Sequence, residues 1–207
     1  MMILEVLIFI MVSVLDGLKT VWGIKVWRGQ DIKFQNIWRE SQTYILILGW
    51  IVVYFTIWIA GGRTVENIRI VELLSTYIIL TVIDAKHRIV PGTIVLCFLS
   101  SQLLMGALYQ VPMELIKMLV GGLVFSIVIY AVTWFSKGNV GMGDAALLGA
   151  TAIAAGWLFT LQILIMAMVL SMIYSIWLIV FRKKWRDTEF PFVPFLAMAL
   201  MIYMIIL

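Results

Sequence analysis

The chain has little of what cysteine-built sites and zinc hydrolases depend on. Its 207 residues include one cysteine, Cys97, one histidine, His87, and only 13% charged residues. One cysteine excludes an internal disulfide and a cysteine-based zinc cluster, and one histidine excludes a His-Glu-x-x-His zinc site. No Gly-x-Ser-x-Gly elbow, phosphate loop or dinucleotide fingerprint occurs. We therefore expect no metal and no cofactor.

What the chain does have is apolar sequence. Hydrophobic residues make up 64% of it, and the mean hydropathy is +1.10, far from the composition of soluble domains. The net charge of +4 does not indicate nucleic-acid binding, because the basic residues are divided among several short loops. The sequence therefore predicts an integral membrane protein in contact with the lipid bilayer.

Apolar runs bounded by charge, glycine or proline predict the membrane spans. The tract 145–181 is too long for one crossing, since its helix would be about 55 Å long at 1.5 Å per residue against a hydrocarbon core of about 30 Å. We expect a break at Ala154-Ala155-Gly156-Trp157, where glycine weakens the helix. The fold class is then an all-α polytopic membrane bundle of about eight transmembrane helices, in one domain, 1–207. The predicted spans are 1–22, 44–60, 67–83, 93–110, 113–136, 145–156, 157–181 and 190–207.

The basic residues agree with eight crossings. Cytoplasmic loops collect Lys and Arg, and this count places twelve of the fifteen on one face. That face then carries a short basic loop at 23–43 and two further loops at 84–92 and 137–144. We expect the cytoplasmic (inner) membrane, with both termini outside and no removable signal peptide at the N-terminus. The twelve are Lys19, Lys25, Arg28, Lys33, Arg39, Lys86, Arg88, Lys137, Arg182, Lys183, Lys184 and Arg186; the other face has Arg63, Arg69 and Lys117.

Two aspartates, Asp84 and Asp144, stand at the edges of apolar segments, where a carboxylate is costly unless it has a partner or a task. Two complete spans separate them, so both are expected at the same cytoplasmic depth. Two close carboxyls share a proton and titrate together. One can then polarise a water for attack on a peptide carbonyl while the other donates a proton.

Each aspartate also has a simpler interpretation. Asp84 could pair with Lys86 or Arg88 at the interface, and Asp144 could be the N-cap of the helix that follows it. Glu5, Asp16, Glu72 and Glu114 also lie in or near spans; for each we expect helix-end pairing or exposure to water. Only the joint placement of Asp84 and Asp144 favours a site.

Three elements in this order resemble the type IV prepilin peptidases, which are Gly-x-Gly-Asp membrane aspartic peptidases. They are Asp84 with its basic turn and Pro91, Gly141-Met142-Gly143-Asp144-Ala145-Ala146-Leu147-Leu148, and Phe190-Pro191-Phe192-Val193-Pro194-Phe195-Leu196-Ala197. The resemblance runs from about residue 70 to the C-terminus. It implies that Asp84 and Asp144 are the catalytic pair.

The resemblance also implies a substrate: a prepilin-like precursor, embedded in the membrane, with a short basic leader that is cut after its closing glycine. Gly141, Met142 and Gly143 would give an extended substrate close access to the backbone. We expect Lys86 or Arg88 to meet an acidic group early in the mature pilin, and we assign both, with Pro191 and Pro194, to substrate binding. The sequence does not predict the oligomeric state.

One departure from the family is instructive. Longer members carry a cytoplasmic domain with paired zinc-binding cysteines after the first span, and they methylate the new N-terminus. Here that stretch is only Gly23 to Thr43 and has no cysteine. Methyltransferase activity is therefore not expected, and this short segment is expected to lie on the membrane surface.

Other interpretations remain open at this point. A preflagellin peptidase is hardly separable by sequence, and presenilin-like enzymes also use Gly-x-Gly-Asp, although their Pro-Ala-Leu element is absent. From a different class, a small ion or proton transporter subunit would use the carboxylates as a relay. A purely structural membrane partner would leave the Gly-Met-Gly-Asp context unexplained.

Overall fold

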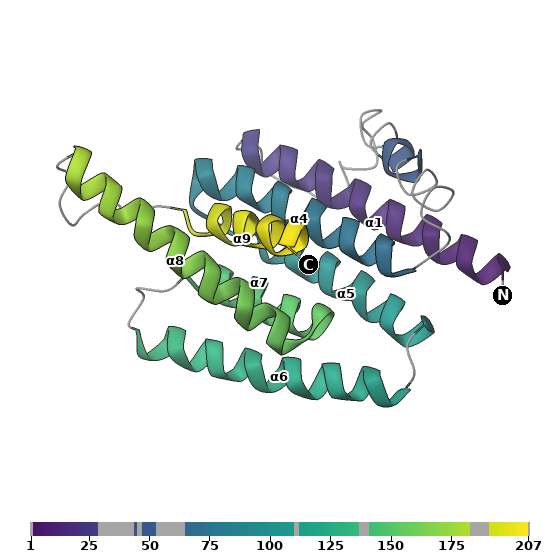
Figure 1. Cartoon of the computed structure of the whole chain (residues 1–207). Helices are drawn as coiled ribbons and strands as arrows, with labels where there is room; N and C mark the ends of the chain where they lie inside the picture. The colour runs from purple at the N-terminus through teal and green to yellow at the C-terminus, as the bar shows by residue number, and fades with distance from the viewer. Residues whose placement is uncertain are drawn as a thin grey trace.

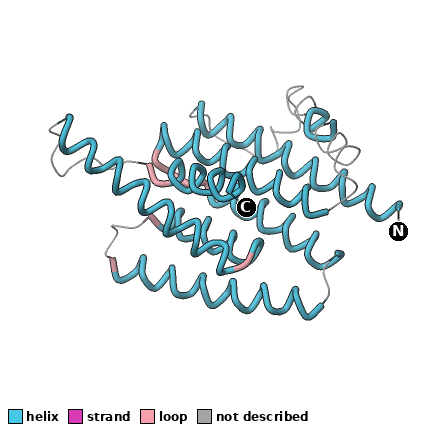
Figure 2. Tube along the Cα trace, in the orientation of Figure 1, coloured by secondary structure: helices cyan, strands magenta, loops and turns pink. Residues whose placement is uncertain are grey.

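A computed structural model describes residues 2–28, 44, 47–52, 65–109, 112–136, 141–182 and 191–206. Within them the chain is helical and is joined by short loops (Figure 2). The helices with both ends described are α1 (Met2–Arg28), α4 (Val65–His87), α5 (Gly92–Tyr109), α6 (Pro112–Phe135), α7 (Met142–Ala155), α8 (Trp157–Arg182) and α9 (Val193–Ile206). The predicted all-α bundle is confirmed.

From α4 to α9 successive helices run in opposite directions, as short connections require, whereas α1 runs parallel to α4 (Figure 1). Helix α7 packs against α5, α6 and α8, and α4 packs against α1, α5 and α9. This order brings the C-terminal end of α4, the N-terminal end of α7 and the N-terminal end of α9 to the same end of the bundle (Figure 1). Asp84, Asp144 and the Pro191–Pro194 element are carried by these three ends.

The core lies where α4, α5, α7 and α9 meet. Tyr77, Leu80, Phe98, Leu147 and Leu196 are its large members, and each is almost completely buried. Because apolar side chains of four helices interlock here, the helix ends that carry the acidic residues rest on a closely packed base.

The long apolar tract breaks as predicted. Helix α7 ends at Ala155 and α8 begins at Trp157, and Gly156 between them has φ of 98°, a conformation that side chains other than glycine rarely adopt. Helix α7 has 14 residues, which is about 21 Å at 1.5 Å per residue. It is shorter than the hydrocarbon core of about 30 Å.

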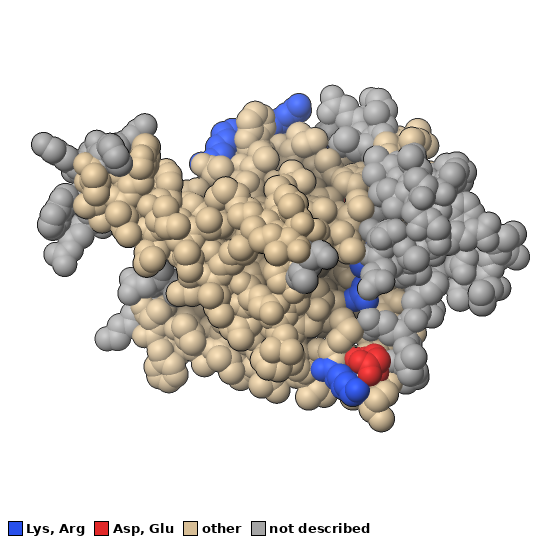
Figure 3. Space-filling view, in the orientation of Figure 1, with Lys and Arg blue, Asp and Glu red and all other residues tan. Residues whose placement is uncertain are grey.

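Among the residues that the structure describes, two helices, α6 over Met113–Phe135 and α8 over Trp157–Val180, are long and apolar enough to cross a membrane. Their outer faces expose large apolar side chains such as Ile127, Trp134 and Ile173. On the face drawn in Figure 3, the described surface shows few charged side chains. The count of eight crossings stays a prediction, and residues 53–60 of the second predicted span lie outside the described part.

Helices α6 and α7 approach each other through small residues. A Cβ at Gly122 would lie 2.5 Å from the Cα of Ile153, and a Cβ at Gly149 would lie 2.8 Å from the Oγ of Ser126. Close backbone approach of this kind is typical of helix pairs in membranes. It fixes α7 against α6, and with it the depth of Asp144.

Several predicted boundaries need correction. Helix α1 continues to Arg28, past the end at residue 22 predicted for the first span; residues 29–43 of the predicted basic loop lie outside the described part. Asp84 lies in the last turn of α4, whereas the sequence predicts it in the loop 84–92. Lys19, predicted among the charges of the basic cytoplasmic face, is buried inside the bundle.

Candidate active site

The Asp84 carboxylate lies against the beginning of α9. Its Oδ2 accepts the backbone N–H of Val193 at 3.0 Å, and the backbone N–H of Phe192 also donates to it. The first N–H groups of a helix have no partner inside the helix and carry its positive dipole end, so they are natural donors to an anion. The start of α9 therefore stabilises a negative charge on Asp84.

The turn after Asp84 ends α4 and leads into α5. The backbone N–H of Arg88 donates to the carbonyl oxygen of Asp84 at 2.9 Å, and Arg88 has φ of 55°, the left-handed geometry that often terminates a helix. Pro91 then opens α5 by accepting the backbone N–H of Ile94 at 3.1 Å. Asp84 is thus held at a fixed helix end.

Asp144 lies in the first turn of α7, and the N-cap interpretation is wrong. The N-cap residue is Gly141, and it has no side-chain cap. The Asp144 carboxyl folds back toward it, since a Cβ at position 141 would lie 3.0 Å from Asp144 Oδ2. A glycine at 141 leaves room for that carboxyl.

The two carboxyls interact electrostatically. Partial burial, together with the negative charge of Asp84, raises the pKa of Asp144 to about 6. Burial also raises the pKa of Asp84, but the N–H groups of Val193 and Phe192 and the charge of Arg88 act in the opposite direction. Both groups lie outside the predicted spans. The pair is therefore unequal, with the charge favoured on Asp84 and the proton on Asp144.

Gly143 lets α7 approach the loop that follows α4. A Cβ at this position would lie 2.7 Å from the Cβ of Val90 and 3.3 Å from its carbonyl oxygen. Any side chain here would push the start of α7 away from the residues that follow Asp84. Of the predicted substrate-binding residues, Gly141 and Gly143 thus lie beside the carboxyls, and Met142 is exposed next to them.

The residues of the basic turn interact with two different groups: Lys86 and His87 with Trp27 at the end of α1, and Arg88 with Asp84. Lys86 Nζ donates to the carbonyl oxygen of Trp27 at 2.6 Å and lies 4.1 Å from the centre of the Trp27 ring; His87 Nε2 lies 2.9 Å from the same carbonyl oxygen. Lys86 therefore binds the end of α1, and the alternative in which it pairs with Asp84 is wrong. Arg88 is exposed, and its charge does act on Asp84.

Pro191 and Pro194 lie on either side of the N–H groups that Asp84 accepts. Pro194 is in the first turn of α9, where a missing N–H costs no intrahelical hydrogen bond. Their position makes them part of the helix start that holds Asp84. Whether they also contact substrate stays a prediction, as it does for Lys86, Arg88 and Met142.

Sequence reasoning missed a buried charged cluster formed by Asp16, Lys19 and Glu72. Lys19 Nζ lies 3.1 Å from Glu72 Oε1 and also contacts Asp16 Oδ1, and all three side chains are fully buried. The expected helix-end pairing or water exposure of Asp16 and Glu72 is therefore wrong. The sequence held one indication, because Asp16 and Lys19 lie three residues apart on one helical face.

Further polar groups from α5 complete the partners of Glu72. Gln102 Nε2 donates to Glu72 Oε2 at 2.8 Å, and the Ser101 hydroxyl contacts Glu72 Oε1. Thr76 accepts a hydrogen bond from Lys19 at 3.1 Å. The cluster therefore joins α1, α4 and α5 through paired charges. By contrast Glu114 pairs with Lys117 at 2.8 Å on the surface, as expected.

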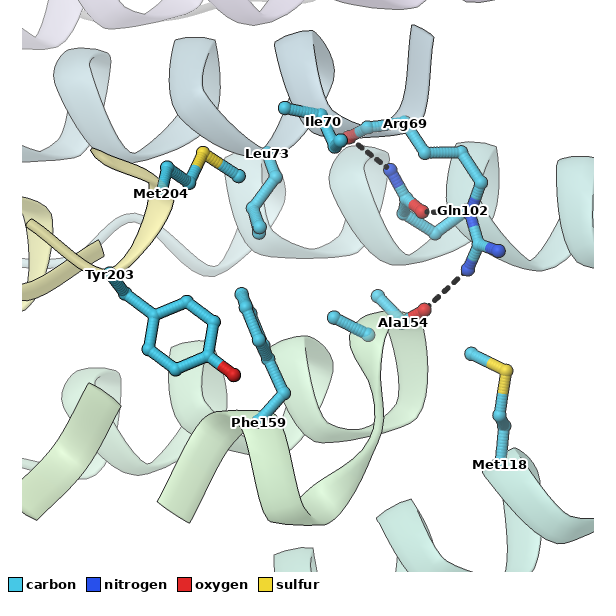
Figure 4. Close-up of a pocket in the computed structure, with 10 residues that line it drawn as sticks. Arg69, Ile70, Leu73, Gln102, Met118, Ala154, Phe159, Tyr203 and Met204 are labelled. Carbon is cyan, nitrogen blue, oxygen red and sulfur yellow. Dashed lines mark hydrogen bonds between the residues drawn. The ribbon is translucent and has the colours of Figure 1, made fainter. Parts of the chain in front are cut away.

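A cavity of about 570 Å³ lies at the other end of α4 and is not part of this site. Arg69 lies in its wall and contacts Gln102 and the carbonyl oxygen of Ala154, while Phe159 and Tyr203 form the opposite wall (Figure 4). Among the residues that the structure describes, no three His, Cys, Asp or Glu side chains converge on a point where they could hold a metal ion.

The fold and these side chains define a class: an apolar helical bundle with an interacting pair of carboxyls at one end. The sequence profile of the type IV leader peptidase family matches residues 71–176, which include both aspartates and Gly141 to Gly143. The match covers about half of the chain. The chain belongs to the type IV leader peptidase family.

One curated relative is similar over most of this chain. The prepilin leader peptidase/N-methyltransferase of Pseudomonas putida is 27% identical over 143 residues, which are 67% of this chain and 49% of the relative. The chain thus spans about half the length of that relative. No solved structure matches the chain.

Proposed function

We propose that the protein is a membrane aspartic endopeptidase that removes the short basic leader of type IV prepilin-like precursors at the cytoplasmic face of the membrane. The observation that carries the proposal is the unequal carboxyl pair. Asp84 accepts the N–H groups at the start of α9, and its charge raises the pKa of Asp144, which burial already holds high, to about 6. A base and an acid beside each other are what peptide hydrolysis by two aspartates requires.

The inequality assigns the roles. Ionised Asp84 takes a proton from a water molecule, whose oxygen attacks the scissile carbonyl carbon. Protonated Asp144 donates its proton to the carbonyl oxygen, which forms a neutral tetrahedral intermediate. The intermediate collapses when its hydroxyl proton returns to Asp144 and the proton held by Asp84 passes to the leaving nitrogen. Both carboxyls then regain their starting states, so no further reagent is needed.

The substrate class follows from the depth of the pair. Asp84 and Asp144 lie on helix ends that meet at one end of the bundle, and the sequence assigns most of the basic residues to that end. A precursor whose apolar helix is already in the bilayer would bring its leader junction to that depth, so that membrane insertion does most of the positioning. The activity named for the Pseudomonas putida relative supports a prepilin leader as the segment removed.

Two finer points belong to the same proposal. The cysteine-free stretch Gly23 to Thr43 supports a peptidase without its own methyltransferase. The proposed residence is the cytoplasmic membrane, with Lys86 and Arg88 at its inner face. A preflagellin-like substrate remains the alternative within this mechanism.

The experiment is direct. The full chain is coexpressed in membranes with a prepilin-like precursor, and the mass of the precursor is followed with time. Loss of the leader, cut after its closing glycine, supports the proposal; a precursor of unchanged mass beside correctly inserted protein contradicts it. A preflagellin-like precursor in a parallel culture identifies the preferred substrate.

A further inference from the structure

We propose that Tyr77 and Thr151 are positioning residues that hold the two aspartates at one depth. The inference rests on the proposed function and adds residues that the reaction itself does not touch. The Tyr77 hydroxyl and Thr151 Oγ1 lie 2.9 Å apart and join α4 to α7. Tyr77 is 1% exposed and Thr151 is 0% exposed, so water does not compete for this hydrogen bond.

The spacing of each hydroxyl from the aspartate on its own helix explains how this hydrogen bond would position the carboxyls. Seven residues separate Tyr77 from Asp84 on α4, and seven separate Asp144 from Thr151 on α7. Seven residues are nearly two helical turns, so each hydroxyl lies on the same face of its helix as the aspartate, about 10 Å along the axis. Because the two helices run in opposite directions, a hydrogen bond that holds the two hydroxyls at the same depth also holds the two carboxyls at the same depth.

Direct contacts between the described parts of α4 and α7 are few. The main neighbours of α7 are α6, α5 and α8, while α4 packs chiefly against α9 and α1. The two helices that carry the aspartates therefore meet mostly through intermediaries. Arg69 also reaches from α4 to the carbonyl oxygen of Ala154 on α7, but at the far end of both helices and through a long flexible side chain. Tyr77 and Thr151 form the link nearer to the carboxyls.

The direction of the hydrogen bond can be assigned. The Thr151 hydroxyl has one proton, and it donates that proton to the Leu147 carbonyl oxygen at 2.8 Å. Tyr77 is therefore the donor and Thr151 Oγ1 the acceptor. A serine at 151 keeps this acceptor, and a valine loses it at almost unchanged volume.

The test uses five isosteric or conservative variants of the full chain. Tyr77→Phe and Thr151→Val remove the link, and Thr151→Ser retains it. Tyr203→Phe is the matched control, because it removes a tyrosine hydroxyl that bonds Gln162 Oε1 at 2.8 Å between α9 and α8. Thr160→Val is the second control, since that buried threonine donates locally, to the carbonyl oxygen of Gly156 directly before α8, at 3.0 Å.

Two readouts separate positioning from a general loss of structure. The first is leader cleavage, for which Tyr77→Phe and Thr151→Val should lower kcat roughly 10- to 100-fold, as expected for a displacement of about 1 Å, with KM little changed. The second is the infrared titration of the Asp144 carboxyl, which should move to lower pH as Asp84 and Asp144 separate. Thr151→Ser and both controls should resemble the wild type.

The second readout does not need enzyme activity. If the wild type cleaves no precursor, the proposed function fails, and the titration of Asp144 still tests the positioning role. If Asp144 titrates alike in the wild type, Tyr77→Phe and Thr151→Val, the positioning role is wrong whatever happens to cleavage. Equal losses of kcat in Tyr77→Phe and Tyr203→Phe would overturn it as well.

Discussion

Asp84 accepts the backbone N–H of Val193 at 3.0 Å, across 109 residues of sequence. The bond places a carboxylate at the N-terminus of α9, the position in a helix that best stabilises negative charge. Among the described residues Asp144 has no comparable donor, and its pKa is raised by burial and by the charge of Asp84. The difference between the two carboxyls therefore comes from the helix end that each one faces.

Removing the charge of Asp84 should make Asp144 easier to ionise. In Asp84→Asn the pKa of Asp144 should fall below about 6, yet remain above its ordinary value, because burial, its larger cause, is unchanged. Infrared titration of the protonated carboxyl band measures this. Glu114→Gln changes an exposed acid in the first turn of α6 and should leave the pKa of Asp144 unchanged. An unchanged pKa of Asp144 in Asp84→Asn would mean that the two carboxyls do not interact.

The pH dependence of cleavage should follow the same pair. A raised pKa means that Asp144 keeps its proton up to about pH 6 and loses it above that value, so kcat/KM of the free enzyme should decline on the alkaline side through this region. On the acid side, activity should fall as Asp84 becomes protonated. Rates measured across this range in membranes of constant composition give the profile. A rate that is flat on the alkaline side would exclude Asp144 as the acid.

Gly143 should tolerate no side chain. In Gly143→Ala the new Cβ would lie 2.7 Å from the Cβ of Val90, so we expect a loss of about 1–3 kcal/mol in stability and a marked loss of cleavage as α7 shifts. Gly92→Ala is the control, since no atom lies within 4 Å of a Cβ there. Adding Val90→Gly to Gly143→Ala should restore part of the activity; no recovery would point to a role for Gly143 other than close packing.

The buried cluster should respond sharply to loss of Lys19. Lys19→Met removes the cation that lies between the buried carboxyls of Asp16 and Glu72, and we expect the free energy of unfolding to fall by about 3–5 kcal/mol. Thermal unfolding in detergent measures this, and adding Glu72→Gln should recover part of it. Lys117→Met, which breaks the exposed pair with Glu114, should cost about 1 kcal/mol or less. Equal losses in the two single variants would contradict the buried pairing.

The sequence predicted those parts of the fold that depend on local pattern. Apolar length predicted the helices, and the break in the long tract was confirmed at Gly156 because one glycine can take a φ of 98° where other residues resist it. Helix ends were less predictable. The last turn of α4 extends past Asp84 because Arg88 caps it in a left-handed conformation. Glycine usually takes this conformation at a helix end, so an arginine at position 88 did not indicate the cap.

The site was predictable only in outline. The order of the spans placed Asp84 and Asp144 at one depth, but the donors at Phe192 and Val193 come from the far end of the chain and have no side chain that would reveal them. Lys19 was misassigned for a related reason. A lysine near the end of an apolar run normally indicates a loop, and only the packing of α1 against α4 and α5 shows that two acids enclose it.

The most direct test of Asp84 and Asp144 as the catalytic pair is leader removal by variants in which one aspartate is replaced by asparagine. Asp84→Asn and Asp144→Asn each keep the size of the side chain and remove its acid chemistry, and Glu114→Gln makes the same change at an exposed acid outside the site. Each is coexpressed with a prepilin-like precursor, and the precursor mass is followed once insertion has been verified. We predict full-length precursor with either aspartate variant and normal processing with Glu114→Gln. Normal processing by both Asp84→Asn and Asp144→Asn would contradict the assignment of this pair as the hydrolytic centre.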